Sequence, residues 1–394
     1  MRVTAEKFAQ GGRSVARLDD GRVVFIDGLF PGEEAEISIV EEKKDYCIAC
    51  VESLISSSPS RRKSPCSFSG QCGGCPWIEL SYDSQVKAKE ELLKDLFSDF
   101  PDAVFKDPVT GPEFGYRGRA RFQYSVRNGK PYLGFCAENS NRSVDINRCI
   151  IADDELNGLI SNPPRLNAWE LKNSELSCIS TDDGVLFSTG SDDDRHGWIT
   201  VAGRKLPVSN RVFFQSNLGL LPSMIDYVVS LVQGPSVMDL YSGVGTFSAY
   251  LEDRFDVTAV EINKHCLSLA RKHLKKTSFF TSPVERWNPK TSRVDTVIVD
   301  PPRVGLDKAV PQMIASWNPS RIVYVSCYAP TLHRDAKRLE ELGYRLESVK
   351  MFDFYPQTPH VETVVLLRDK KVDGHINVNL DVEKSEIKSE RVTS

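Results

Sequence analysis

Apolar and polar residues alternate along the first part of the chain. The stretch GRVVFIDGLFPGEEAEISIV, residues 21–40, changes between apolar and polar positions and is interrupted at Gly28 and at Pro31-Gly32. This pattern predicts short strands joined by turns. We expect residues 1–62 to form a small OB-like β-barrel. Such a barrel is a common nucleic-acid-binding module, although one with a purely structural role has the same pattern.

A different pattern begins near residue 207. Segments with helical spacing, such as NKHCLSLARKHLKK, alternate with apolar runs that predict the strands SVMDLYS, DVTAVEI, VDTVIVD and RIVYVSC. Repeated strand–helix units predict a parallel sheet with helices on both faces, so the fold class is α/β with a Rossmann-like domain over residues 207–384. Alternation over residues 376–382 predicts a final edge strand, and the polar residues 385–394 predict a disordered tail.

Residues 63–206 mix the two patterns and predict a small α+β domain. Residues 81–97 have helical spacing, and residues 113–135 are rich in strand-forming residues. Residues 111–148 interleave the aromatic residues Tyr116, Phe122, Tyr124 and Tyr132 with basic ones. Only three acidic residues stand against seven basic residues, which are Arg117, Arg119, Arg121, Arg127, Lys130, Arg142 and Arg148. Such a segment suits a surface that binds phosphates and stacks bases. The alternative is an exposed strand face with scattered charge.

Composition narrows the class of protein. The chain has 394 residues, with 50 Lys and Arg against 54 Asp and Glu, a net charge of −4 and 40% hydrophobic residues. These values predict two or three folded domains and exclude a mainly disordered chain or a protein that coats nucleic acid through bulk positive charge. Because no apolar run approaches about 18 residues and the start MRVTAEKF lacks the apolar core of a signal peptide, we expect a cytoplasmic protein without a membrane segment.

Two glycines follow a predicted strand in a position typical of a cofactor site. Gly243 and Gly245 in DLYSGVGTF let the backbone pass close to a ligand beyond the strand end. Glu261 ends the next strand, where a carboxylate accepts hydrogen bonds from ribose hydroxyls. Ser248 stands where the third glycine of the dinucleotide fingerprint would fall, which disfavours NAD. The pattern therefore favours an adenosine-type cofactor.

Two later strand ends carry reactive side chains at the same edge of the predicted sheet. Asp300 precedes two prolines, and this rigid acidic loop favours contact with a ligand over a purely structural turn. Cys327 ends the strand RIVYVSC. A lone cysteine is usually an inert buried thiol, but its position beside a cofactor site favours a nucleophile.

Ten cysteines is a high number for a chain without an export signal. In the cytosol thiols stay reduced, so cysteines at short spacing indicate metal or cluster ligands. Cys66, Cys72 and Cys75 form a C-x5-C-x2-C pattern that, with a distant fourth cysteine, suits either zinc or an iron–sulfur cluster. Cys47 and Cys50 lie three positions apart in a predicted strand, so they point to opposite faces and do not chelate jointly.

The chain contains several further motifs in a fixed order: SVMDLYSGVGTF, VIVDPPRVGLD, VYVSC, TLHRDAKRL and HVETVVLL. Together and in this order they resemble one family, the RNA 5-methyluridine (uracil-C5) methyltransferases. FFQSN at residues 213–217 resembles its cofactor-binding segment, and the first sixty residues resemble the RNA-binding TRAM domain of many members. Cys66, Cys72 and Cys75 with Cys149 resemble the [4Fe-4S] site of the branch that modifies 23S ribosomal RNA.

This resemblance implies a class I S-adenosylmethionine-dependent enzyme that methylates carbon 5 of a uridine through a covalent cysteine–C6 adduct. It implies that Cys327 is the nucleophile and Glu362 the general base. The cofactor contacts it implies, with the glycine pair, are Gln215, Tyr241, Gly243, Gly245, Glu261 and Asp300. It favours 23S ribosomal RNA as the partner and a [4Fe-4S] cluster; a monomer suffices for this mechanism. Transfer RNA as the substrate, or an inactive RNA-binding protein, are the alternatives.

The chain departs from the family pattern at three places. Tyr328-Ala329-Pro330 follows the expected nucleophile where Asn-Pro is usual, and Ser282-Pro283 replaces an acidic residue on the adenine side. Cys136 stands where an aromatic residue is usual. Cys136 therefore competes with Cys149 as the fourth cluster ligand.

Overall fold

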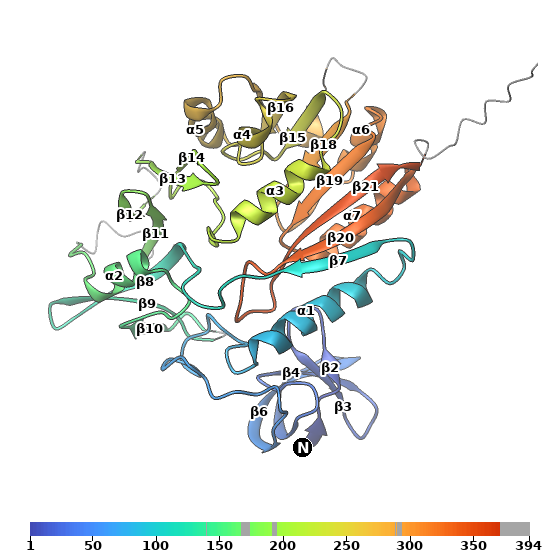
Figure 1. Cartoon of the computed structure of the whole chain (residues 1–394). Helices are drawn as coiled ribbons and strands as arrows, with labels where there is room; N and C mark the ends of the chain where they lie inside the picture. The colour runs from blue at the N-terminus through green and yellow to red at the C-terminus, as the bar shows by residue number, and fades with distance from the viewer. Residues whose placement is uncertain (139, 167–173, 191–194, 288, 290–293, 371–394) are drawn as a thin grey trace, which may run out of the picture.

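The computed structural model describes residues 1–138, 140–166, 174–190, 195–287, 289 and 294–370. Its strands form four sheets, of six, five, two and eight strands (Figure 1). The expected edge strand at 376–382 and the tail at 385–394 lie outside these residues. The α/β fold class with a preceding β-barrel-like region is confirmed.

The N-terminal region is the six-stranded sheet, in the order β1-β5-β6-β4-β3-β2. Alternate side chains of its strands, including Val24, Ile26 and Ala49, are buried in one core, as the alternation of the sequence predicts. The strands are β1 (Arg2–Thr4), β2 (Lys7–Phe8), β3 (Ser14–Arg17), β4 (Val23–Asp27), β5 (Glu34–Glu42) and β6 (Tyr46–Ser56).

The middle of the chain supplies a long helix, a five-stranded sheet in the order β10-β9-β8-β11-β12 and the hairpin β13-β14. Its elements are α1 (Tyr82–Leu96), β7 (Val104–Val109), β8 (Arg119–Arg127), β9 (Lys130–Cys136), β10 (Ser143–Ile146), α2 (Asp154–Ser161), β11 (Glu175–Thr181), β12 (Gly184–Ser188), β13 (Gly197–Val201) and β14 (Arg204–Val208). Strand β7 does not join the five-stranded sheet; it pairs in parallel with β20 at the edge of the largest sheet.

The largest sheet has eight strands in the order β17-β16-β15-β18-β19-β21-β20-β7. Its remaining elements are α3 (Leu221–Leu231), β15 (Ser236–Leu240), α4 (Ser248–Leu251), β16 (Asp256–Glu261), α5 (Lys264–His273), β17 (Ser278–Thr281), the 3₁₀ turn η3 (Val284–Arg286), β18 (Thr296–Val299), α6 (Val310–Ser316), β19 (Arg321–Ser326), α7 (Ala329–Glu341), β20 (Tyr344–Phe352) and β21 (Glu362–Asp369). Strands β15 to β19 are parallel neighbours, whereas β21 runs antiparallel to β19.

Helices cover both faces of this sheet, and each face has its own core. Ile298 and Val323 pack with the apolar side of α3, while Val297 and Ile322 pack with α6, α7 and α1. Neighbouring residues of one strand thus enter opposite cores, which explains why these strands are continuous apolar runs in the sequence. In Figure 1, α1 lies between the large sheet and the N-terminal barrel. None of the described helices has the length and apolarity that a membrane crossing requires.

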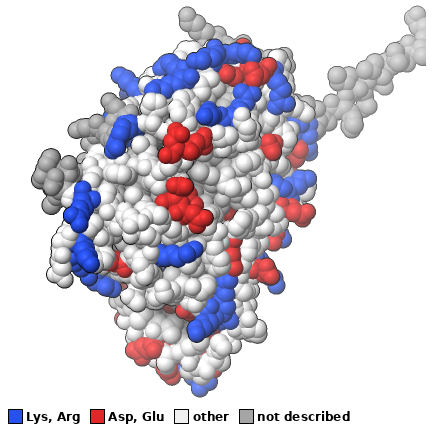
Figure 2. All heavy atoms as spheres, turned by 60° about the vertical axis from the view of Figure 1, so that its left-hand side comes forward, with Lys and Arg blue, Asp and Glu red and all other residues white. Residues whose placement is uncertain are grey.

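The basic segment at 111–148 does not form one continuous stacking surface. Tyr116, Phe122 and Tyr124 are buried in the molecule, and only Tyr132 of the four aromatic residues is exposed. The strand face with scattered charge therefore describes the segment better. Figure 2 likewise shows basic and acidic side chains on the same face, with acidic groups gathered near its middle.

Candidate active site and cysteine cavity

The ends of four strands bring the candidate catalytic and cofactor residues to one edge of the large sheet. Leu240 pairs with Val260 and with Val299, so the residues that follow β15, β16 and β18 lie side by side. Strand β21 runs the other way, and Ser326 pairs with Thr363, so Cys327 after β19 lies next to Glu362 at the start of β21. This edge is where open α/β sheets bind ligands.

The turn after β15 is held in an unusual backbone conformation. Tyr241 has a φ of 60°, Gly243 a φ of 56° and Gly245 a φ of 80°. A Cβ on Gly245 would lie 2.5 Å from Cδ1 of Leu274, so Leu274 would have to shift, and the φ of 80° itself favours glycine. Left-handed backbone at a tyrosine is strained and is typical of functional sites.

Two carboxylates support this turn. Glu261 accepts hydrogen bonds from the backbone N–H of Gly243 at 3.0 Å and of Asn263 at 2.7 Å. Asp239, the fourth residue of β15, is fully buried and accepts a 2.6 Å hydrogen bond from Oγ of Ser248. Burial raises the pKa of Asp239 to about 6. Glu261 therefore orders the glycine turn.

Cys327, Asp300 and Glu362 form an electrostatically coupled group. Burial raises the pKa of Cys327 to about 11, with smaller contributions from Glu362 and Asp300. Burial and, to a lesser extent, Asp239 raise the pKa of Asp300 to about 7. Burial, helped by Asp300, raises the pKa of Glu362 well above its usual value. Burial thus shifts all three groups toward their protonated forms.

Tyr355 completes this group. Its hydroxyl donates a 3.2 Å hydrogen bond to Oε1 of Glu362, which is 1% exposed. Burial raises the pKa of Tyr355 well above its usual value, and Glu362 and Cys327 raise it further. Among the described residues, Oε2 of Glu362 has no hydrogen-bond partner. The carboxylate is therefore held at one oxygen and open at the other.

Gln215 lies in the segment Phe214–Asn217. The carbonyl of Ser216 accepts a 2.7 Å hydrogen bond from the N–H of Gly118, just before β8. Nδ2 of Asn217 donates to the carbonyl of Phe354 at 3.2 Å, which ties the segment to the loop that carries Tyr355. Gln215 is 7% exposed, and its Oε1 is buried without a partner in the described part of the chain. Such an atom is a ready acceptor for a bound ligand.

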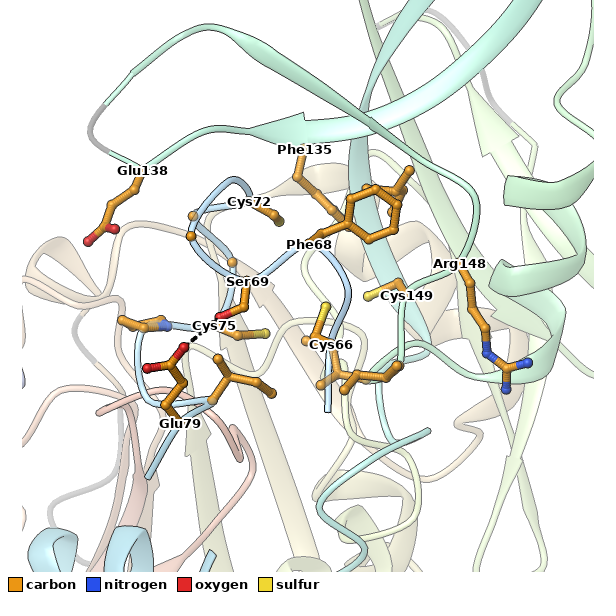
Figure 3. A pocket seen from close by; sticks show the side chains of 18 of the residues that line it. Cys66, Phe68, Ser69, Cys72, Cys75, Glu79, Phe135, Glu138, Arg148 and Cys149 are labelled. Carbon is orange, nitrogen blue, oxygen red and sulfur yellow. Dashed lines mark hydrogen bonds between the residues drawn. The ribbon is translucent and has the colours of Figure 1, made fainter. Parts of the chain in front are cut away.

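Four of the ten cysteines surround a second site, a cavity of about 180 Å³. Cys66, Cys72 and Cys75 come from the loop before α1, and Cys149 follows β10. Figure 3 shows their side chains turned toward a common space, beside Phe68 and Phe135. Burial raises the pKa of Cys75 to about 12, and Cys149 and Cys72 add to this effect. The thiols are thus close enough to affect one another.

Arg117 lines this cavity, whereas Cys136 does not. The guanidinium of Arg117 lies 5.8 Å from the ring centroid of Phe135. Cys136 instead lines a neighbouring cavity with Glu138 and Asp27, while its carbonyl accepts a hydrogen bond from the N–H of Gly73. No group of three or more His, Cys, Asp or Glu side chains among the residues described is arranged to hold a metal ion.

Sequence reasoning missed Tyr355, Asp239 and Arg303 at the active site. Asp239 lies within a predicted apolar strand, four residues before Gly243, and a charged residue at such a position was a usable signal. Tyr355 lies in a loop with no periodic pattern, seven residues before Glu362. Arg303 lies over the ring of Tyr328 at 5.2 Å and opposes the rise in the Cys327 pKa. Arg119, expected to face RNA, instead donates to the carbonyl of Phe214 at 3.4 Å.

Comparisons with known proteins identify the family. Residues 284–370 match the family described as tRNA (uracil-5-)-methyltransferase, and residues 1–51 match the TRAM domain. An uncharacterized RNA methyltransferase from Thermotoga maritima is 32% identical, over 93% of this chain and 98% of its own. The 23S rRNA (uracil(1939)-C(5))-methyltransferase RlmD of Cronobacter sakazakii is 30% identical to this chain, and the match covers 92% of this chain and 95% of the relative's length.

A solved structure extends the likeness to the whole fold. The tRNA (uracil-54, C5)-methyltransferase of Pyrococcus abyssi, in complex with S-adenosyl-L-homocysteine, superposes with a TM-score of 0.73 at 25% identity. The match covers 93% of this chain and 99% of that one. With the strand-edge site and the relatives above, it follows that this chain belongs to the family of S-adenosylmethionine-dependent RNA (uracil-C5)-methyltransferases.

Proposed function

We propose that this enzyme methylates carbon 5 of a uridine in 23S ribosomal RNA through a covalent bond between Cys327 and carbon 6. The observation that carries the mechanism is the meeting of Cys327 and Glu362 at paired strand ends, with Asp300 beside them. A thiol next to a buried carboxylate with a raised pKa provides both a nucleophile and a base at one place.

The reaction needs a nucleophile because carbon 5 of uracil reacts too weakly with a methyl donor by itself, and it needs a base because carbon 5 must lose its proton afterwards. Addition of the Cys327 thiolate to carbon 6 forms an enolate and places electron density on carbon 5. S-adenosylmethionine supplies the methyl group when bound. Glu362 then removes the proton from carbon 5, and the bond between carbon 6 and the cysteine sulfur breaks. Burial favours the neutral acid at Glu362, which makes its carboxylate a strong base when ionised.

The cofactor contacts we propose are Gln215, Tyr241, Glu261 and Asp300 with the two glycines, Gly243 and Gly245. Support comes from the open acceptor of Gln215 and from the strained turn at Tyr241. Asp300 lies beside Cys327 as well, so we place it between the cofactor and the target base. A uridine in folded RNA must leave its stack to reach this pocket.

We further propose that Cys66, Cys72, Cys75 and Cys149 hold a [4Fe-4S] cluster. The four thiols surround one cavity of about 180 Å³. Both zinc and an iron–sulfur cluster accept four cysteines. The resemblance of this cysteine pattern to the branch that modifies 23S ribosomal RNA supports the cluster. The proposed reaction transfers no electron, so the cluster would order its loop and the RNA-facing surface around it.

Ribosomal RNA is preferred to transfer RNA because the set of four cysteines resembles the branch that acts on 23S RNA. The relative from Cronobacter sakazakii carries that substrate in its name. Transfer RNA remains the second candidate, on the fold likeness to the enzyme of Pyrococcus abyssi. A monomer suffices for this mechanism, and we propose a cytoplasmic monomer. We also propose the domains 1–62, 63–206 and 207–384 for barrel, cluster and catalysis, although α1 and β7 of the middle segment pack with the catalytic sheet.

One experiment tests the substrate and the nucleophile together. Labelled S-adenosylmethionine is incubated with separate 23S, 16S and transfer RNA transcripts, and the methylated uridine is mapped. We expect label at carbon 5 of uridine in 23S RNA and none with Cys327→Ala. Cys266→Ala is the matched control. Cys266 lies on α5 and is buried in the hydrophobic core on one face of the large sheet, so its variant should leave methyl transfer intact. Methylation by Cys327→Ala, or label only in transfer RNA, would contradict the proposal.

A further inference from the structure

The carboxylate of Glu362 is held asymmetrically. Tyr355 donates a 3.2 Å hydrogen bond to Oε1, while Oε2 is buried without a partner among the residues that the structure describes. Buried carboxylate oxygens normally accept hydrogen bonds, because leaving one unpaired costs free energy. An open buried oxygen beside a nucleophile indicates that another group occupies this place during the reaction.

We propose that Tyr355 is a positioning residue for proton removal, which rests on the proposed role of Glu362 as the base. By fixing Oε1, Tyr355 sets the plane of the carboxylate and leaves Oε2 to accept the proton from carbon 5. The electron pair of the C5–H bond forms the C5=C6 double bond. The electron pair of the C6–S bond returns to Sγ of Cys327, which leaves as a thiolate.

The backbone of Tyr355 is fixed well enough for this role. Nζ of Lys89 on α1 donates to the carbonyl of Tyr355 at 3.1 Å and to Asp353 at 2.6 Å, and both charged side chains of this pair are fully buried. Oγ1 of Thr358 donates to the same carbonyl at 2.9 Å. The loop of Tyr355 is thus anchored to helix α1 through Lys89 and held internally by Thr358.

A second anchor follows at Gln357. Its φ is 70°, and its N–H donates a 2.7 Å hydrogen bond to Oε1 of the buried Gln85. Nε2 of Gln85 donates in return to Oε1 of Gln357 at 2.9 Å. The carbonyl of Gln357 accepts from the N–H of Trp77, two residues after the cluster cysteine Cys75. This reciprocal pairing leaves the loop little freedom, so the hydroxyl of Tyr355 has a defined direction.

The charged groups that face Glu362 come from two other strand ends. Asp300 after β18 raises its pKa, and Cys327 after β19 lies beside it. The hydrogen bond from Tyr355 acts in the opposite direction, because it favours the ionised carboxylate. Removal of this hydroxyl should therefore shift the acidic limb of the turnover profile to higher pH, since Glu362 must be ionised to accept a proton.

The test compares Tyr355→Phe with Tyr344→Phe in the full-length enzyme. Tyr344 begins β20, and its buried hydroxyl donates to the carbonyl of Pro319 at 3.1 Å, so its variant loses the same kind of hydrogen bond far from the site. On uridine RNA we expect Tyr355→Phe to turn over about tenfold to a hundredfold more slowly, part of what a general base contributes. We also expect methylated covalent adduct to accumulate, and the acidic limb to move to higher pH.

RNA containing 5-fluorouridine separates the steps, because its carbon 5 carries no proton to remove. Tyr355→Phe should form this adduct within about twofold of the unmodified enzyme, since only addition and methyl transfer are needed. Unchanged turnover and pH profile would overturn the inference, as would equal loss of adduct and turnover, which indicates a general structural defect. Glu362→Gln tests the proposed function separately: if it turns over normally, Glu362 is not the base, whatever Tyr355→Phe does.

Discussion

Cys327 shows how far neighbouring residues determine the reactivity of one side chain. Burial, Glu362 and Asp300 raise its pKa to about 11, and Arg303 only partly opposes them. In protein without cofactor, we expect iodoacetamide to alkylate Cys327 slowly at neutral pH. The rate should rise until about pH 11, because the thiolate is the reactive form. Peptide mass spectrometry measures this rate, with the exposed Cys50 as a reference for reagent access; a pH-independent rate would contradict the prediction.

At this scale, the sequence was informative where function coincides with strand ends. Asp300 and Cys327 each follow a strongly apolar run, so their meeting at one sheet edge follows from parallel topology. Tyr355 follows from no such rule. Its position depends on contacts between its loop and Lys89, which lies 264 residues earlier than its partner Asp353. Contacts at this separation have no local sequence pattern.

Helix α1 illustrates the element scale, because one of its faces fixes the catalytic loop. Lys89→Met leaves Asp353 buried without its cation, and removing one partner of a buried pair costs about 3–5 kcal/mol. Lys87→Met on the exposed face breaks only a 3.9 Å pair with Glu91, and such pairs contribute about 0–1 kcal/mol. We expect urea unfolding to show a large loss of stability for the first variant and a small one for the second. Equal losses would show that Lys89 does not anchor the loop.

Helical spacing predicted a helix at 81–97, and the structure has α1 at Tyr82–Leu96, with Ser81 at its N-terminal cap. The buried face of α1 also contains Gln85 and Lys89, polar residues that a hydrophobic pattern assigns to solvent. Their partners are Gln357 and Asp353, far along the chain. The sequence therefore predicted this element but not what it contacts.

At the scale of the whole molecule, the cysteine cavity joins loops from separate parts of the chain. Cys149 lines this cavity, whereas Cys136 lines the neighbouring one. After purification without oxygen, we expect Cys149→Ser to lose iron, acid-labile sulfide and visible absorption, and Cys136→Ser to retain them. Retention of iron and sulfide by Cys149→Ser, with loss in Cys136→Ser, would reverse the assignment. Zinc without sulfide in the unaltered protein would reject the cluster.

The pairing of strand β7 affects how the protein folds during synthesis. Strand β7 pairs with β20 at the edge of the eight-stranded sheet, although most of the chain separates them. During synthesis, β7 therefore leaves the ribosome long before the strand that it will pair with, and α1 is the neighbour already present to shield it. The eight-stranded sheet that carries the catalytic residues is complete only when its last strands, β20 and β21, have emerged. A fragment beginning at residue 207 would expose the edge of β20, which is a template for aggregation.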